Sequence, residues 1–176
     1  MKDILLKVCG LLELEDCAAH ITGGTSSDEA ARLINCLNAC YREIAADYCP
    51  LIAKASVVSN GLVPYAALGG RAYAVRSVKK NGADAAFRNL AAGIETESGA
   101  LEIEFSYMPE ELDAQSADWA YGTTVNISAL CYGTASEFCL SSGMYDEAAV
   151  WHSKFIAALP DGKSLGKYLP RRRWLE

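Results

Sequence analysis

Histidine is scarce in this sequence, and the common motifs of catalytic sites are missing. Among 176 residues only His20 and His152 are histidines, and a nucleophile needs a base such as histidine within reach. No Gly-x-Ser-x-Gly elbow occurs, and neither a Gly-x-Gly-x-x-Gly nor a Gly-x4-Gly-Lys-Ser/Thr string is present. Those loops position serine nucleophiles, dinucleotides and phosphates. We therefore expect no catalytic residues and no cofactor.

Long apolar runs are also lacking. A charged residue interrupts every long hydrophobic segment before it reaches the roughly 18 residues that a membrane-spanning helix needs. The formal net charge is −6 and the isoelectric point is near 5.0, and neutralising phosphates requires a positive surface. We therefore expect no membrane partner, and DNA contact only of a local and non-specific kind.

Cysteine, in contrast, is frequent. The seven cysteines are an odd number and no secretory leader is recognisable, so we expect reduced thiols in a cytosolic setting. Cys36 and Cys40 lie one helical turn apart, with Cys49 and His20 as further conceivable ligands, but this is not a zinc spacing. Buried thiols beside a helical core stripe are the favoured interpretation and no metal is expected. The cysteines are Cys9, Cys17, Cys36, Cys40, Cys49, Cys131 and Cys139.

Helical periodicity dominates both ends of the chain. Apolar residues recur at spacings of three and four, oxygens at residues 25–27 offer an N-cap, and Pro50 and Pro160 cannot continue a helix. Gly143 occupies the place of a glycine that follows a helix C-terminus. These patterns predict four helices, over residues 3–19, 25–49, 127–143 and 146–160.

The middle of the chain has the pattern of a sheet. Short β-prone runs between Ile52 and Tyr107 are separated by four dipeptides that favour the positive φ of hairpin turns. In the last run Leu101, Ile103 and Phe105 alternate with acidic residues, which predicts a half-buried strand. The turn dipeptides are Asn60-Gly61, Gly69-Gly70, Asn81-Gly82 and Ser98-Gly99.

These patterns together predict an α+β protein. We expect a bundle of about four helices, interrupted by a small antiparallel β-rich insertion and followed by an irregular C-terminal arm. The expected divisions are N-terminal helices over residues 1–50, the β-rich insertion over 51–109, C-terminal helices over 117–160 that pack on the N-terminal ones, and an extended basic arm over 161–176.

Charge is unevenly distributed along the chain. Residues 95–118 include eight acids and no Lys or Arg; within them Glu102 and Glu104 favour solubility over paired-carboxylate chemistry. The C-terminal arm is basic, and two interpretations stay open: a solvated end, or an arm that docks on an acidic partner surface with a Trp anchor. The candidate partner-binding residues are Lys163, Lys167, Tyr168, Arg171, Arg172, Arg173 and Trp174.

Three passages resemble one protein family. They are residues 41–45 (Tyr-Arg-Glu-Ile-Ala), residues 71–82 followed by 101–109, and the paired-helix segment 129–151, with its Gly-Met-Tyr-Asp-Glu-Ala sequence. This order of elements is similar to the head-to-tail adaptor proteins of tailed bacteriophages, especially the tail tubular protein A type. The resemblance implies a non-enzymatic connector that forms a ring of identical subunits, a dodecamer, between the portal protein and the tail.

The resemblance carries further expectations. DNA would pass through the ring without being read, the arm from Lys163 to Trp174 would reach the portal or an adjacent subunit, and the protein would be made in the bacterial cytoplasm and end in the virion. The chain and its β insertion are short for a tail tubular protein, which leaves a head-completion or tail-completion position open.

Two alternatives from other classes also stay open. A small cytosolic enzyme or ligand-binding domain would use a sheet–helix crevice near Cys131, Cys139 and His152. A regulatory interaction module would bind nucleic acid through its basic tail, in a salt-sensitive manner.

Overall fold

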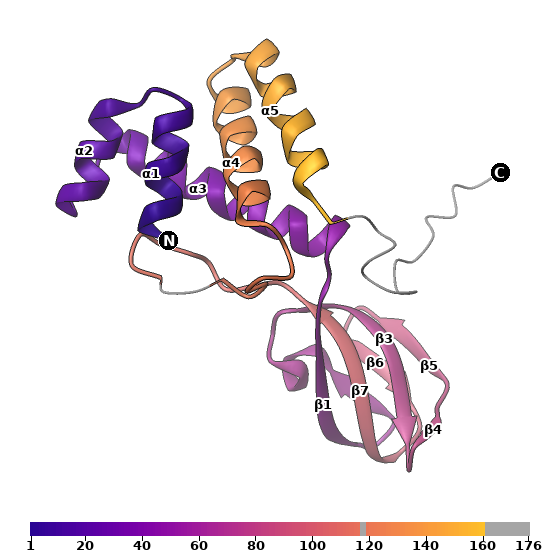
Figure 1. Ribbon diagram of the computed structural model, residues 1–176. Coiled ribbons are helices and arrows are strands. Elements are labelled where there is room, and N and C mark those ends of the chain that lie inside the picture. Colours follow the sequence, from indigo (N-terminus) through magenta and orange to yellow (C-terminus); the bar gives the residue numbers. More distant parts are fainter. Residues whose placement is uncertain (117–118, 161–176) are drawn as a thin grey trace. The chain divides into compact units, whose positions relative to one another are not determined.

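The computed structural model describes residues 1–116 and 119–160, and Figure 1 traces them. The chain divides into two compact units. The helical unit comprises Met1–Cys49 and the residues from Glu110 onward, and the β unit comprises Pro50–Pro109. All candidate residues of the basic arm, from Lys163 to Trp174, lie outside the described residues.

Five α-helices build the described part of the helical unit, so the expectation of a bundle of about four helices is wrong. The predicted first helix is two helices, because the chain turns at Glu13, whose φ is 57°. A continuous helix would have brought Glu15 and Asp16 onto the apolar stripe of Leu5, Val8 and Leu12, whereas the turn buries other side chains instead. The helices are α1 (Lys2–Leu11), α2 (Glu15–Gly23), α3 (Asp28–Glu43), α4 (Ile127–Ser141) and α5 (Tyr145–Ala158).

Helix α3 begins as the sequence indicates. The Ser27 side chain accepts a hydrogen bond from the Ala30 N–H at 3.1 Å, which confirms the predicted N-cap. Near its end the helix changes to a π-helical turn, Ile44–Tyr48, and the helical stretch stops before Pro50. A wider turn of this kind is rare and often marks a functional position.

Helix α4 is the centre of the helical unit and contacts α1, α3 and α5. Gly133 makes this possible, because a Cβ at that position would overlap the Cys40 Sγ and lie 3.1 Å from Cδ2 of Phe155. Gly143 has a φ of 77° and lies in the turn between α4 and α5, as predicted. Figure 1 shows these two helices running side by side in opposite directions.

The long connection that enters the helical unit after the sheet is tied down by Asn38. The buried Asn38 amide donates to the Leu112 carbonyl at 2.9 Å and accepts from the Leu112 N–H at 2.7 Å. Further along, the Tyr121 hydroxyl donates to the Cys49 carbonyl at 2.7 Å and packs against Tyr41. Side chains of this connecting segment, which is neither helix nor strand, therefore form part of the core of the helical unit.

Two antiparallel sheets, and not one small sheet, form the β unit. Strands β1 (Leu51–Ser59), β7 (Gly99–Tyr107), β3 (Ala72–Lys80) and β4 (Ala83–Asp84) form one sheet in that order. Strands β2 (Leu62–Pro64), β6 (Gly93–Thr96) and β5 (Phe87–Leu90) form the other. The expectation of a single small sheet is therefore wrong. The chain passes from one sheet to the other at turns whose sequences look like those of hairpin turns.

One apolar core holds the two sheets together. Val63 and Ile94 from the smaller sheet pack with Val78, Ile103 and Phe105 from the larger one. The predicted alternation of β7 is confirmed, since Leu101, Ile103 and Phe105 are buried and Glu102 is exposed. Ser106 is the exception on the other face, because it is buried and accepts a hydrogen bond from Arg76 Nε at 2.7 Å.

The glycines of the four predicted turn dipeptides have positive φ values, but of these dipeptides only Asn81-Gly82 closes a hairpin, since the other three lie between strands of different sheets. Asn81 and Gly82, between β3 and β4, have φ values of 52° and 82°, the pair of positive values that a two-residue hairpin turn requires. Within residues 1–116 and 119–160, no helix is long and apolar enough to cross a membrane.

Candidate functional site

The residues of the alternative enzyme interpretation are not assembled into a common site. Cys131 and Cys139 are buried on α4, and burial raises the pKa of both thiols. His152 is exposed on α5, and its ring lies beside that of Phe155, at 5.8 Å between centroids.

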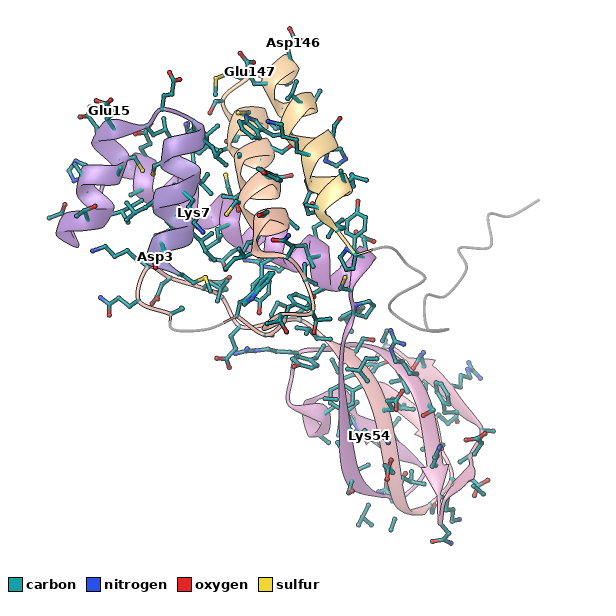
Figure 2. The ribbon with its side chains drawn as sticks, in the orientation of Figure 1. Asp3, Lys7, Glu15, Lys54, Asp146 and Glu147 are labelled. Atoms are coloured by element: carbon teal, nitrogen blue, oxygen red, sulfur yellow. The ribbon has the colours of Figure 1, made fainter. Side chains whose placement is uncertain are left out.

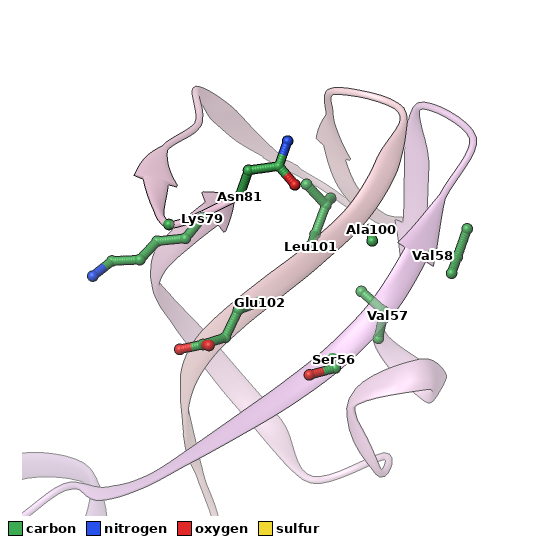
Figure 3. Close-up of a pocket in the computed structure, with 9 residues that line it drawn as sticks. Ser56, Val57, Val58, Lys79, Asn81, Ala100, Leu101 and Glu102 are labelled. Carbon is green, nitrogen blue, oxygen red and sulfur yellow. The ribbon is translucent and has the colours of Figure 1, made fainter.

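Two surface hollows are present in the described residues. One, of about 350 Å³, lies on the larger sheet between β1, the end of β3 and β7 (Figure 3). Val57 and Val58 line one side of it, and Lys79 and Glu102 lie on another. The second, of about 520 Å³, lies between the loop at Gly122 and the end of α5 at Ala158. Neither is lined by Cys131, Cys139 or His152.

The cysteines of α3 have separate surroundings. The Sγ of Cys36 lies 4.0 Å from the Ser141 hydroxyl, and that of Cys40 lies 4.0 Å from the Leu130 carbonyl oxygen. Burial raises the pKa of both thiols. In the part of the chain that the structure describes, no group of three His, Cys, Asp or Glu side chains is placed to hold a metal ion.

The four acids of the acidic stretch that belong to the β unit, Glu95, Glu97, Glu102 and Glu104, each lie within 4.0 Å of a basic side chain. Lys54 lies 3.1 Å from Glu102 and 3.9 Å from Glu104, and the hydrogen bond and charge of Glu102 raise the pKa of Lys54. On the same unit, Lys80 pairs with Glu97 at 3.1 Å and Arg88 with Glu95 at 4.0 Å. These acids, which are clustered in the sequence, therefore lie beside basic side chains in the folded β unit.

The helical unit has the opposite character. Residues 1–49 and 110–160 contain fifteen Asp or Glu and five Lys or Arg. Four of these acids, Asp3, Glu15, Asp146 and Glu147, are labelled in Figure 2 and lie in the first turns of their helices, where the helix dipole favours negative charge. A cationic partner surface would complement this unit.

A partly buried carboxyl lies where α3 becomes π-helical. Burial and the charge of Glu137 raise the pKa of Glu43, while the charge of His152 and a hydrogen bond from Tyr48 oppose that shift. The sequence gives no sign of this arrangement, because it depends on the π-helical turn and on the approach of α4 and α5. Neither hollow described above includes Glu43.

The most unusual surface is the outward face of α5. Ala148 and Phe155 face the core, and by helical periodicity the opposite side carries Asp146 and Lys154 together with several small and apolar residues. Val150 is 55% exposed and Ile156 is 43% exposed. The Ser153 hydroxyl donates to the Ala149 carbonyl of its own helix at 3.0 Å. We define the outward face of α5 as Ala149, Val150, Ser153, Ile156 and Ala157, all of which are exposed.

This apolar surface continues onto the turn between α4 and α5. Leu140 is 51% exposed and Tyr145 is 69% exposed, and the acids Asp146 and Glu147 follow at once. On one flank of α5, Trp151 stacks on Tyr132 at 5.9 Å, with the Lys154 ammonium 4.1 Å from the Trp151 ring. Contiguous exposed apolar residues with a polar rim are typical of interaction surfaces.

The sequence pattern misplaced part of this surface. Spacings of three and four in the sequence group Ile156 and His152 with Phe155 on one side of this helix, yet Ile156 and His152 are exposed. A helical wheel alone could have found the outward face, because Ala149, Ser153 and Ala157 lack charge. A stripe of alanines, however, gives no sign of whether a neighbour covers it.

No family model matches the sequence, and no curated protein matches it.

Proposed function

We propose that the protein is a non-enzymatic structural component of a tailed bacteriophage, a head-to-tail adaptor that assembles as a ring between the portal protein and the tail. Its partners are the portal, a tail protein and further copies of itself. It is made in the cytoplasm of the bacterial host and becomes part of the virion, where DNA passes through the ring without sequence-specific contact.

The observation that carries the proposal is the set of exposed small and apolar residues on α5. An exposed helix normally turns charged side chains to water, and α5 does so at Asp146, Glu147 and Lys154, but Val150 and Ile156 are also exposed, at 55% and 43%. Burial of such residues against another protein is favourable by about 25 cal/mol per Å² of apolar surface. The passage 129–151, which resembles paired adaptor helices, includes Ala149 and Val150 of this face.

The distribution of charge also supports assembly into a ring. Copies of a helical unit with fifteen acids and five bases repel one another at close range, so a ring needs cations at its interfaces. The arm residues Lys163, Lys167, Arg171, Arg172 and Arg173 supply them in every copy. We assign to this arm the contact with the portal or an adjacent subunit, with Tyr168 and Trp174 as apolar anchors.

The proposal is tested by a pull-down of the cognate portal with the full chain, followed by electron microscopy of the complex. We expect ring-shaped complexes with the full chain and loss of binding when the chain ends after Leu159. Binding of the portal by neither chain would refute the adaptor function.

A variant separates loss of the arm from loss of the fold. Val150→Asp places a charge on the outward face of α5, where the side chain is already 55% exposed, so the fold tolerates it. We expect this variant to keep its circular dichroism spectrum and melting temperature but to form no rings. Val58→Asp, on an 87% exposed position of β1, is the matched control and leaves ring formation unchanged.

A further inference from the structure

Strand β1 forms one edge of the larger sheet. It pairs with β7 on one side, and among the described residues no strand pairs with its other side. In that part of the chain, no further backbone hydrogen bond reaches residues 51–59. About half of the N–H and C=O groups of an edge strand point away from its neighbour. Strand β1 therefore offers a row of backbone donors and acceptors to another strand.

The usual protections of a sheet edge are missing from β1. Edge strands in natural proteins are commonly short, bulged, rich in charge or interrupted by proline. Strand β1 has nine residues and pairs with β7 without a register shift. It contains no proline, and Lys54 is its one charged residue. The opposite edge of the same sheet, β4, has only two residues. An edge as long and regular as β1 can accept a further strand.

The exposed side chains of β1 are arranged symmetrically about its centre. Every second side chain is exposed and lies on one face, namely Ile52, Lys54, Ser56 and Val58. Ile52 is 45% exposed and Val58 is 87% exposed, and each lies three residues from Ala55 in the sequence. Figure 3 shows Val58 at the outer margin of the sheet. An antiparallel second copy of β1, with Ala55 opposite Ala55, would therefore place each Ile52 beside a Val58.

Charge favours the same register. With Ala55 at the centre, Lys54 lies opposite Ser56 of the second copy. A register centred on Lys54 would oppose two lysines, and one centred on Ser56 would oppose Lys54 with Val58. Lys54 also lies 3.1 Å from Glu102 of its own chain, so its charge is balanced there. Of these three registers, only the first pairs the exposed apolar residues with each other and keeps the lysines from facing one another.

We propose that the free edge of β1 binds β1 of a second copy of this chain, with the two strands antiparallel and Ala55 opposite Ala55. The two larger sheets then form one continuous sheet across the contact. A contact of this kind closes with two copies, so it differs from any contact that builds a ring and does not rest on the proposed adaptor function. Addition of one strand to another buries little surface, so we expect a weak dimer that dissociates in dilute solution.

Analytical ultracentrifugation of the full chain over a series of concentrations tests dimer formation. We expect a reversible monomer–dimer equilibrium, and about tenfold weaker association for Ser56→Lys, because that variant opposes two lysines at two symmetric places. Within its own chain residue 56 lies opposite Glu102, so the substituted side chain has a partner and the circular dichroism spectrum is unchanged. A monomer at every concentration up to about 1 mM would overturn the proposal and leave the edge to a strand of another protein. Unchanged association of Ser56→Lys would also overturn it.

Cysteine crosslinking tests the register. In the double variant Ile52→Cys with Val58→Cys, each new thiol faces a new thiol of the second copy, at the separation that a disulfide needs. Ile52→Cys alone and Val58→Cys alone are the matched controls, because each thiol then faces an apolar side chain, and all seven native cysteines are buried. With oxidised glutathione as the oxidant, we expect the double variant to form a covalent dimer about tenfold faster than either control, with links between positions 52 and 58 in peptide maps. Equal rates in the three variants would refute the proposed pairing.

Discussion

The two units of the molecule treat charge in opposite ways. In the β unit, Glu95, Glu97 and Glu102 each have a basic side chain within 4.0 Å on a neighbouring strand or turn, so their charges are balanced locally. Residues 1–49 and 110–160 of the helical unit contain fifteen acids and five bases. The comparison teaches that the acids of the β unit are paired within that unit, whereas the described helices carry an excess of acids that a cationic surface would complement.

The largest effect is expected in the shared core of the two sheets. Ile103 is fully buried between them, so Ile103→Ala leaves a cavity and lowers the free energy of unfolding by about 2–5 kcal/mol. Chemical denaturation, followed by circular dichroism, measures this. Val58→Ala, on an exposed position of the same unit, is the control and changes stability by less than about 0.5 kcal/mol. Similar losses in both variants would contradict the shared core.

A smaller effect is expected where the helical unit holds its connecting segment. Asn38→Ala leaves the N–H and the carbonyl of Leu112 without their buried partner, at a cost of about 1–3 kcal/mol in the free energy of unfolding. Asn35→Ala, on the exposed side of the same helix, is the matched control. Hydrogen exchange of the Leu112 amide gives a direct readout, and unchanged protection in Asn38→Ala would exclude the anchoring role.

A pH-dependent effect is expected at Glu43. Burial raises the pKa of this carboxyl in the folded state, so the folded protein holds the proton more tightly than the unfolded chain does. Its contribution is favourable below the ordinary pKa near 4.5 and is lost as the pH rises through the raised value of the folded state. Glu43→Gln removes this dependence.

Melting temperatures of the wild type and Glu43→Gln, measured from pH 4 upward in matched buffers, test that expectation. Relative to the variant, the wild type becomes less stable as the pH rises. A constant difference across the series would show that Glu43 has the same pKa in both states.

The smallest effect is expected at the exposed ion pairs of the β unit. Lys54→Ala removes the partner of Glu102 and Glu104, but solvent screens such exposed pairs, so the change in stability is expected to be small. Double-mutant cycles with Glu102→Ala, at low and at high salt, measure the coupling. A coupling that does not weaken with salt would contradict its exposed, electrostatic nature.

Local patterns predicted much of the secondary structure. The Ser27 cap and the Asn81-Gly82 turn were correct because each depends on hydrogen bonds or dihedral angles of a few adjacent residues. The break at Glu13 was missed, because neither glycine nor proline marks it and only the burial of residues beyond it shows the change of direction. The π-helical turn at Ile44–Tyr48 was missed for a related reason, since packing decides how the last turns of a helix wind.

The candidate surface was less predictable than the fold. A wheel of α5 shows which residues share a side, but His152 and Ile156 were assigned to the core side and lie exposed. The basic arm, with its residues from Lys163 to Trp174, was identified by composition alone and lies outside the described residues. Its role stays a prediction, which the portal pull-down tests.

The sequence by itself determined where turns occur, which strand residues face the core and where net charge accumulates along the chain. These properties depend on nearest neighbours and on residue type. Only the tertiary structure decided that the sheet strands form two layers around one core, that Lys54 of β1 lies beside Glu102 and Glu104 of β7, and that Val150 and Ile156 of α5 are exposed. Each of these outcomes depends on contacts between residues far apart in the sequence, and a local sequence pattern does not predict such contacts.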